Sequence, residues 1–170
     1  MLDFGCGTGT LILMIKEKYL NAQVSGVDVD PKILNIAGKK VSDSTYEIEL
    51  IEYDGITLSY EDKSFDKVLS SLVFHHLTRK QKIRALEEIY RVLKPEGELH
   101  IMDFGKARNT IMRIMFFPFQ ILDGIRNTHD NIKRRIPGYM KNAGFSSVVE
   151  TGRIITVFGT LSFYKDKKPG

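Results

Sequence analysis

The sequence predicts an α/β fold in which a doubly wound, mostly parallel sheet carries helices on both faces. Three observations lead to this prediction. Strand-like and helix-like patterns alternate from the first residue to Asp103, which is the order of βαβ units. A glycine-rich turn joins the first strand to the first helix. The last two predicted strands are separated only by Gly152, so they must form an antiparallel hairpin.

The first elements surround the glycine-rich turn. A short strand before Gly5 leads through the turn into the first helix, and Pro31 suits the first position of a second helix. Alternating apolar residues predict strands on either side of that helix and again before Asp103. In chain order, we expect helix 10–19, strand 22–28, helix 31–40, strand 46–53, strand 65–71, helix 78–93 and strand 98–103.

The helix over 78–93 has the clearest boundaries. Thr78 and Gln81 have the spacing of a capping box, and an apolar stripe follows them along one face. Lys94-Pro95-Glu96-Gly97 is typical of a helix stop.

The pattern changes after Asp103. Residues 107–126 are helix-like and apolar with a break at Pro118, and a short helix is expected over 137–143, ended by Gly144. The hairpin is predicted from strands 146–151 and 153–164. Gly159 inside the second of these strands suggests a bulge.

Composition limits the class of protein. A chain of 170 residues with 42% hydrophobic and 27% charged residues is an ordinary single globular domain. The only cysteine, Cys6, excludes a disulfide-built fold, and no metal site is predicted. A net charge of +4 is too small to indicate nucleic acid. We see no targeting segment and no apolar run long enough to span a membrane, so a cytoplasmic location is expected.

The strongest chemical signal is the turn that contains Gly5, Gly7 and Gly9. Glycines let the backbone approach a ligand closely, and the helix that follows offers free N–H groups at its N-terminus. Asp28 ends the next strand, 19 residues after Gly9. A carboxylate about 20 residues after such a turn binds the hydroxyls of a ribose.

The glycine spacing narrows the ligand. Dinucleotide-binding turns have the pattern G-x-G-x-x-G, whereas this turn has G-x-G-x-G. Asp3 lies two residues before the first glycine, where a carboxylate suits a positively charged ligand better than a pyrophosphate. These features disfavour a nicotinamide oxidoreductase.

Taken together, the motifs resemble the class I S-adenosylmethionine-dependent methyltransferases, and within them the ubiquinone/menaquinone C-methyltransferase-like group. The resemblance covers nearly the whole chain. It rests on LDFGCGTG (2–9), GVDVDPKIL (26–34), SFDKVLSSLVFHHL (64–77), LKPEGELHIMDF (93–104) and NAGFSSVVETGR (142–153). It implies a Rossmann-like sheet of seven strands whose last strand is antiparallel, with S-adenosylmethionine as the cofactor.

The resemblance also implies roles for individual residues. Asp3 would hold the cofactor's amino group, directly or through water, and Asp28 both ribose hydroxyls. Val29 would lie against the adenine, and Asp54 would accept from its amino group. The remaining cofactor-binding residues would be Gly5, Gly7 and Gly9 under the methionine part, together with Ser71.

Other residues have less specific interpretations. His75 and His76 follow the fourth strand at the ligand-binding edge, and one of them is a candidate general base. The alternative is that they only pack or bond the loop. Asp30 is expected to be a helix N-cap. Cys6 is expected to be a buried filler rather than a reactive thiolate.

Two parts of the single domain over 1–170 bear on whether it can enclose a substrate and catalyse a reaction. The segment 107–141 is expected to be an insertion that covers the substrate or forms an interface, with a core-packing helix as the alternative. The sequence given begins at the first motif, so we expect a domain without the helices that usually precede that motif in this family. Their absence favours an oligomer, such as a homodimer, and puts catalysis in doubt.

Two main hypotheses follow for function. The first is an enzyme that transfers a methyl group from S-adenosylmethionine to a small, apolar acceptor. The second is a binding or regulatory module that holds the cofactor without turnover. A nucleic-acid methyltransferase is disfavoured because residues 70–74 lack the proline of the amino-directed enzymes.

Overall fold

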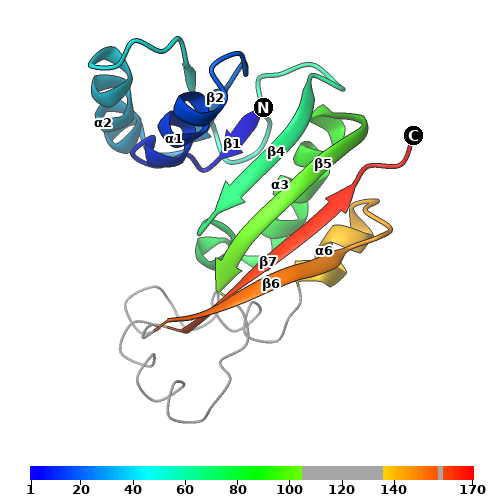
Figure 1. Cartoon of the computed structure of the whole chain (residues 1–170). Helices are drawn as coiled ribbons and strands as arrows, with labels where there is room; N and C mark the ends of the chain where they lie inside the picture. The colour runs from blue at the N-terminus through cyan, green and yellow to red at the C-terminus, as the bar shows by residue number, and fades with distance from the viewer. Residues whose placement is uncertain (105–135, 157–158) are drawn as a thin grey trace.

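The computed structural model describes residues 1–104, 136–156 and 159–170, which form a seven-stranded sheet with helices on both faces (Figure 1). The strand order is β3-β2-β1-β4-β5-β7-β6. In chain order the strands are β1 (Leu2–Phe4), β2 (Ser25–Asp28), β3 (Glu49–Glu52), β4 (Phe65–Ser71), β5 (Leu93–Phe104), β6 (Val149–Thr156) and β7 (Gly159–Lys167). The helices are α1 (Thr10–Lys18), α2 (Pro31–Ser42), the 3₁₀ turn η1 (Phe74–His76), α3 (Arg79–Val92) and α6 (Ile136–Asn142).

The predicted fold class is confirmed. Strands β1 to β5 pair in parallel, and β7 runs antiparallel to both β5 and β6. The strand order reverses at β1, which pairs with β2 on one side and β4 on the other. In open sheets of this kind, ligands bind outside the carboxyl ends of the strands at such a switch point.

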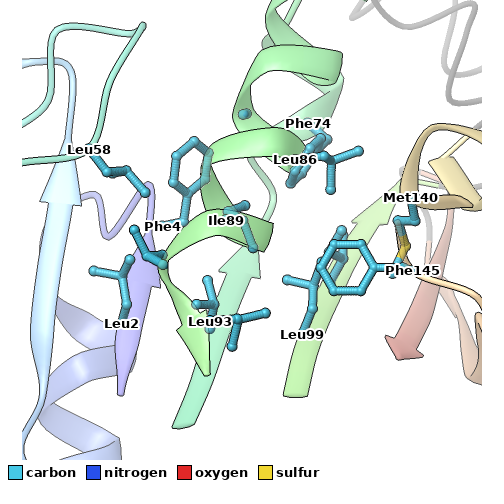
Figure 2. Packing of buried hydrophobic residues seen from close by; sticks show 14 of the residues in the cluster. Leu2, Phe4, Leu58, Phe74, Leu86, Ile89, Leu93, Leu99, Met140 and Phe145 are labelled. Carbon is cyan, nitrogen blue, oxygen red and sulfur yellow. The ribbon is translucent and has the colours of Figure 1, made fainter. Parts of the chain in front are cut away.

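Two apolar layers cover the sheet. On one face, α3 and α6 pack Leu86, Ile89 and Met140 against Leu2 and Leu99, all of them fully buried (Figure 2). The other face carries a smaller cluster, which includes Cys6, Ile12, Ile15 and Val24 beside residues of α2. Each fully buried aliphatic side chain contributes about 1.5–3 kcal/mol to folding. The sheet edge that holds the glycine-rich turn is therefore rigidly supported.

Local helix signals were predicted correctly. Thr78 accepts from the Gln81 N–H, and the Gln81 side chain accepts from the Thr78 N–H, so the capping box is complete. Asp30 caps α2 by accepting from the N–H groups of Lys32 and Ile33. Both motifs use only neighbouring residues, which explains why the sequence was sufficient to predict them.

The predicted stop of α3 is confirmed, but the expected start of the next strand at Glu98 was too late. The helix ends at Val92, but β5 begins at once and runs through Lys94–Gly97. Pro95 favours an extended Lys94, and Lys168, after the end of β7, exchanges backbone hydrogen bonds with Glu96 and Gly97. This long-range pairing holds part of an expected loop in the strand. Conversely, residues 22–24 and 46–48, expected as strand, lie outside β2 and β3.

The final hairpin is antiparallel as predicted, but its reversal was misplaced. β6 continues through Gly152, and the pairing of Thr156 with Gly159 places the reversal between those two residues. The register shifts between Glu150 and Gly152, so the irregularity lies there and not inside β7 at Gly159, which is the first residue of that strand. A bulge adds a residue without ending the strand, which periodicity alone cannot distinguish from a turn.

The short helix predicted over 137–143 is α6, and Gly144 follows it with φ 107°. The predicted helix 107–126, and most of the insertion 107–141, lie outside the described residues.

Candidate active site at the carboxyl edge of the sheet

The glycine-rich turn leaves the carboxyl end of β1 with a left-handed backbone at each glycine. The φ angles are 76° at Gly5, 55° at Gly7 and 77° at Gly9. Only glycine adopts this conformation without a steric penalty. The N–H groups of Gly5 and Cys6 both donate to the carbonyl of Val27, at 2.9 Å. The turn is thus fixed against the end of β2.

The three glycines differ in what surrounds them. A Cβ at Gly5 would lie 2.3 Å from a methyl group of Val73, and one at Gly9 would lie 3.1 Å from the Cβ of Ala37. A Cβ at Gly7 would meet nothing within 4 Å. Packing therefore requires Gly5 and Gly9, whereas Gly7 borders open space that a ligand can use.

Asp28 connects the turn to β2. One carboxylate oxygen accepts from the Gly7 N–H at 2.9 Å, and the other accepts from the Asp30 N–H at 3.1 Å. The side chain is half-buried. A carboxylate has about four lone-pair positions, so each oxygen retains capacity to accept from a ligand hydroxyl.

Asp3 is the buried charge of the site. Its residue is 2% exposed, and its Oδ1 atom has no hydrogen-bond partner among the described residues. Burial, together with the neighbouring charge of Asp28, raises the pKa of Asp3 to about 7. An unpaired carboxylate in this position is costly, and a positively charged ligand group would remove the cost.

Cys6 lies in the same turn but is not poised to react. It is 6% exposed, and a Cβ at Gly26 would lie 2.9 Å from its sulfur. Burial, with the charges of Asp3 and Asp28, raises the pKa of the Cys6 thiol to about 12. The side chain is therefore a protonated, buried filler, as the sequence suggested.

The loop between β3 and β4 brings Gly55, which follows Asp54, close to Val29: a Cβ at Gly55 would lie 4.0 Å from a methyl group of Val29. The Tyr53 N–H donates to the carbonyl of Asp28 at 2.8 Å, which joins the ends of β2 and β3. Val29 is 57% exposed. Asp54 Oδ1 accepts from the N–H groups of Ile56 at 2.7 Å and Thr57 at 2.8 Å, and these bonds lower its pKa. Asp54 is thus an exposed, ionised carboxylate.

The end of β4 completes this edge. Ser71 is the half-buried last residue of the strand, and Leu72 follows it with φ 58° and donates to the carbonyl of Met102 at 2.8 Å. The hydroxyl of buried Ser70 donates to the carbonyl of Phe4 at 3.0 Å. The end of β4 is therefore bonded to both neighbouring strands: to β1 through the Ser70 side chain and to β5 through the backbone of Leu72.

The two candidate histidines occupy different environments. His75 is 4% exposed, and its Nδ1 lies 2.9 Å from Asp103 Oδ1 while its backbone N–H donates to Asp103 Oδ2 at 3.1 Å. His76 is exposed, and its ring centroid lies 3.8 Å from that of His75. The sequence could not distinguish the two, whereas the structure gives them separate positions.

Asp103 is a site residue that sequence reasoning missed. It is fully buried at the end of β5 and organises η1 through His75. An acid at the carboxyl end of a predicted strand was the available signal, because that edge carries ligand sites. Within the described residues, no group of three or more His, Cys, Asp or Glu side chains could hold a metal ion.

Comparison with known proteins identifies the family. A family profile described as "Methyltransferase domain" matches residues 1–97. A demethylmenaquinone methyltransferase of Thermus thermophilus is 38% identical over 189 aligned positions, which cover 99% of this chain and 82% of that protein. The chain belongs to the S-adenosylmethionine-dependent methyltransferases.

Other relatives of this methyltransferase are matched over less of their length. The chloroplastic 2-phytyl-1,4-beta-naphthoquinone methyltransferase of Arabidopsis thaliana is 30% identical, with 86% of this chain and 64% of that protein covered. A demethylmenaquinone methyltransferase of Lactobacillus johnsonii is 35% identical, but the chain covers only 47% of it. The chain therefore spans about half to two-thirds of these two proteins.

Solved structures support the methyltransferase fold. A phosphoethanolamine N-methyltransferase of Haemonchus contortus in complex with S-adenosylmethionine has a TM-score of 0.82 at 19% identity, covering 100% of this chain and 48% of that one. A methyltransferase of Methanosarcina mazei has a TM-score of 0.79 at 19% identity, covering 99% of this chain and 91% of that one. S-adenosylmethionine is the cofactor of the family to which the chain belongs.

Proposed function

We propose that S-adenosylmethionine binds at the carboxyl edge of β1, β2 and β4. The buried Asp3 carboxylate, with one oxygen unpartnered among the described residues, is the observation that carries this proposal. The cofactor has an ammonium and a sulfonium, and either charge would stabilise an ionised Asp3. The open space at Gly7 gives the ligand room beside that carboxylate.

Each remaining residue has a proposed contact. Asp28 accepts from the ribose hydroxyls, since its oxygens retain acceptor capacity. Exposed Val29 lies against the adenine, and Asp54 accepts from the adenine amino group. The methionine part lies over the three glycines of the turn, beside the backbone at Ser71.

The proposed acceptor is a reduced naphthoquinone of the demethylmenaquinone type. The support is the 38% identity to the Thermus thermophilus enzyme over nearly the whole chain, together with the Arabidopsis thaliana relative. Phosphoethanolamine is the competing acceptor, because a Plasmodium falciparum enzyme named for it is 33% identical over 61% of the chain. That match is shorter, so we favour the quinol.

S-adenosylmethionine supplies an activated methyl group when it is bound. The chain's own contribution is to hold the acceptor in line, exclude water and accept a proton. A quinol ring carbon becomes more nucleophilic when a ring hydroxyl loses its proton. His76, the exposed member of the pair, takes that proton. After methylation, the methylated carbon loses its hydrogen as a proton to water, the ring oxygen takes a proton back from His76, and the ring regains its aromaticity. Asp103 fixes His75, and the His75 ring supports His76.

His76→Ala should therefore reduce turnover by about 100-fold or more, which is the usual contribution of a general base. The affinity for S-adenosylhomocysteine should stay within about threefold of wild type, because His76 does not bind the cofactor. His100→Ala, on β5, is the matched control and should retain full turnover. Equal rates for His76→Ala and wild type would remove the base from the mechanism.

The binding proposal is tested by calorimetric titration with S-adenosylmethionine and S-adenosylhomocysteine. Asp28→Ala should abolish measurable binding, because it removes both the ribose acceptor and the bond to Gly7. Asp30→Ala, two residues away, should lose only about 1 kcal/mol of stability as an N-cap and keep its affinity. Unchanged binding in Asp28→Ala would contradict the assigned site.

Turnover is then measured with radiolabelled methyl donor and either reduced demethylmenaquinone or phosphoethanolamine. Radiolabel in the organic extract would support reduced demethylmenaquinone as the acceptor. Radiolabel in the aqueous product would support phosphoethanolamine. Cofactor binding without transfer to either acceptor would favour the alternative, a cofactor-binding module with an incomplete active site.

The proposed setting is the cytoplasm, with a small-molecule acceptor and no nucleic acid partner. No helix among the described residues is long and apolar enough to cross a membrane. A homodimer is also proposed, and sedimentation velocity of the purified chain would test it.

A further inference from the structure

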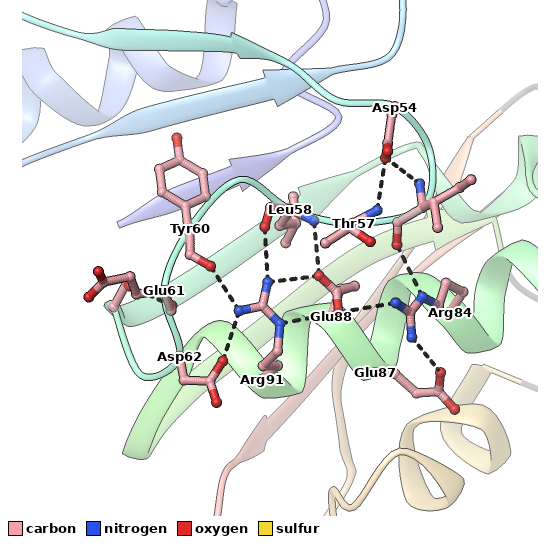
Figure 3. A network of polar contacts seen from close by, with 12 residues as sticks. Asp54, Thr57, Leu58, Tyr60, Glu61, Asp62, Arg84, Glu87, Glu88 and Arg91 are labelled. Carbon is pink, nitrogen blue, oxygen red and sulfur yellow. Dashed lines mark hydrogen bonds and ion pairs between the residues drawn. The ribbon is translucent and has the colours of Figure 1, made fainter.

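Three charged side chains of α3 grip the backbone of the loop between β3 and β4 (Figure 3). We call Arg84, Glu88 and Arg91 the α3 clamp. Arg84 Nε donates to the carbonyl of Ile56 at 3.1 Å. Glu88 Oε2 accepts from the Leu58 N–H at 2.9 Å, and Arg91 Nη2 donates to the Leu58 carbonyl at 2.9 Å. The clamp therefore holds the loop at successive points along one helix face.

Glu88 is the centre of the clamp. It is 4% exposed, and it accepts from both Nη2 (2.8 Å) and Nε (3.2 Å) of Arg91. Burial alone would raise the pKa of Glu88, but the hydrogen bonds from Arg91 and Leu58 outweigh it and leave that pKa below its usual value. Arg91 in turn donates to the Tyr60 carbonyl and to Asp62. An ionised, buried carboxylate thus ties helix and loop together.

The gripped loop carries Asp54. Asp54 Oδ1 is bonded to the N–H groups of Ile56 and Thr57, and the carbonyl of the same Ile56 is bonded to Arg84. The peptide group between Ile56 and Thr57 therefore donates to Asp54 through its N–H and accepts from Arg84 through its carbonyl, and the N–H of the next peptide group, at Leu58, donates to Glu88. Within the described residues, both hydrogen bonds to the Asp54 carboxylate use Oδ1, which leaves Oδ2 for a ligand.

We propose that Glu88, through the α3 clamp, positions Asp54 and thereby sets the selectivity of the cofactor site for the amino group of adenine. This inference rests on the proposed adenine contact of Asp54. Glu88 is a positioning residue, because its contacts are with the loop backbone and Arg91. When the loop is already ordered, Asp54 accepts a hydrogen bond from the ligand with no further loss of loop conformational entropy, so binding is tighter than with a mobile loop.

The test compares S-adenosylhomocysteine with S-inosylhomocysteine, in which a carbonyl replaces the adenine amino group. The carbonyl cannot donate to Asp54, so the wild type should bind the inosyl ligand about tenfold more weakly, the value of an exposed hydrogen bond to a charged group. Glu88→Gln should lower affinity for the adenosyl ligand and leave that for the inosyl ligand within about twofold. Glu87→Gln is the matched control, because Glu87 is exposed, touches no loop backbone among the described residues and lies in a loose ion pair with Arg84, at 3.7 Å.

Hydrogen exchange gives a second readout without any ligand. The amides of Ile56 and Thr57 should exchange at least several-fold faster in Glu88→Gln than in Glu87→Gln, since the loop is released. Should Glu88→Gln fail to fold, Arg84→Gln removes one exposed arm of the clamp and should reduce the adenosyl preference partially.

The outcomes separate the clamp from the adenine contact. Full adenosyl preference in Glu88→Gln, or an equal loss for both ligands, would overturn the positioning role. If Asp54→Ala keeps the preference, the adenine contact itself is wrong, whatever Glu88 does. If Asp54→Ala loses the preference for the adenosyl ligand, and the double variant Asp54→Ala/Glu88→Gln loses no more, then Glu88 acts on the cofactor through Asp54.

Discussion

Asp3 and Asp54, two of the carboxylates in the site, have opposite surroundings. Asp3 lies in the sheet, 2% exposed, with an unpartnered oxygen in the described structure and a pKa raised to about 7. Asp54 lies on an exposed loop, accepts two backbone hydrogen bonds, and has a pKa below its usual value. The Asp3 carboxylate therefore lacks a partner for one oxygen until a cationic ligand binds, whereas the Asp54 carboxylate already has hydrogen-bond partners without ligand.

The difference shows two ways to build affinity. Burying the ionised Asp3 carboxylate destabilises the folded chain, and a positively charged ligand group would offset this destabilisation. We therefore expect ligand binding at Asp3 to be strong and to depend on pH. At Asp54 the carboxylate is already ionised and ordered, so it offers orientation and selectivity but a smaller gain. Three predictions test this contrast.

The largest effect is expected at Asp3. Asp3→Asn should weaken S-adenosylmethionine binding at pH 7.5 by about 100-fold or more, because the ligand cation loses a buried partner. In the wild type, affinity should fall toward tenfold per unit as pH drops below about 7, because protonation of Asp3 removes its charge. Titrations between pH 5.5 and 8 measure both effects. If the affinity of Asp3→Asn still changes with pH as in the wild type, the pH dependence comes from a group other than Asp3.

A smaller effect is expected at Asp54. Asp54→Ala should weaken S-adenosylhomocysteine binding about tenfold, in the range of one exposed, charge-assisted hydrogen bond. Because the pKa of Asp54 is lowered, its carboxylate stays ionised from pH 5.5 to 8. The variant should therefore retain the pH slope of the wild type. If the affinity of Asp54→Ala no longer changed with pH, the pH dependence could not be assigned to Asp3 alone, and the proposed difference between Asp3 and Asp54 would be wrong.

A third effect is on stability, and its sign is opposite to that on binding. The pKa of Asp3 is about 7 in the folded chain against 3.8 as its ordinary value. The folded state then holds a proton that the unfolded state releases, so this group's contribution to stability falls as pH rises from about 4 to 7. Without ligand, Asp3→Asn should melt several degrees above wild type at pH 8 and close to it near pH 4. A lower melting temperature at pH 8 would contradict the cost assigned to burying Asp3.

Features encoded by neighbouring residues were predictable. The glycine-rich turn, the Asp30 cap, the Thr78 capping box and the end of β2 at Asp28 each depend on residues close together in the chain. Their geometry follows from local sterics and hydrogen bonding, which sequence spacing records. The family resemblance extended this to the sheet as a whole, and the parallel order with an antiparallel β7 was confirmed.

Features that depend on distant residues were not predictable in the same way. The reversal of the final hairpin was misplaced because a bulge at Glu150–Gly152 and a turn look alike in periodicity. At Glu96 and Gly97, the early part of β5 is held by backbone hydrogen bonds with Lys168, which lies far along the chain. Asp103 was missed because its partner, His75, comes from another strand end.

By itself, the sequence determined the fold class, the glycine-rich turn and the carboxylates that flank it. Only the tertiary structure decided that Asp3 is buried and unsatisfied, that His75 is held while His76 is exposed, and that Glu88 grips the loop of Asp54. The physical reason is that pKa, burial and orientation depend on which groups lie within a few ångströms. Chain folding sets those distances between residues about 30 positions apart, beyond the range of any local pattern.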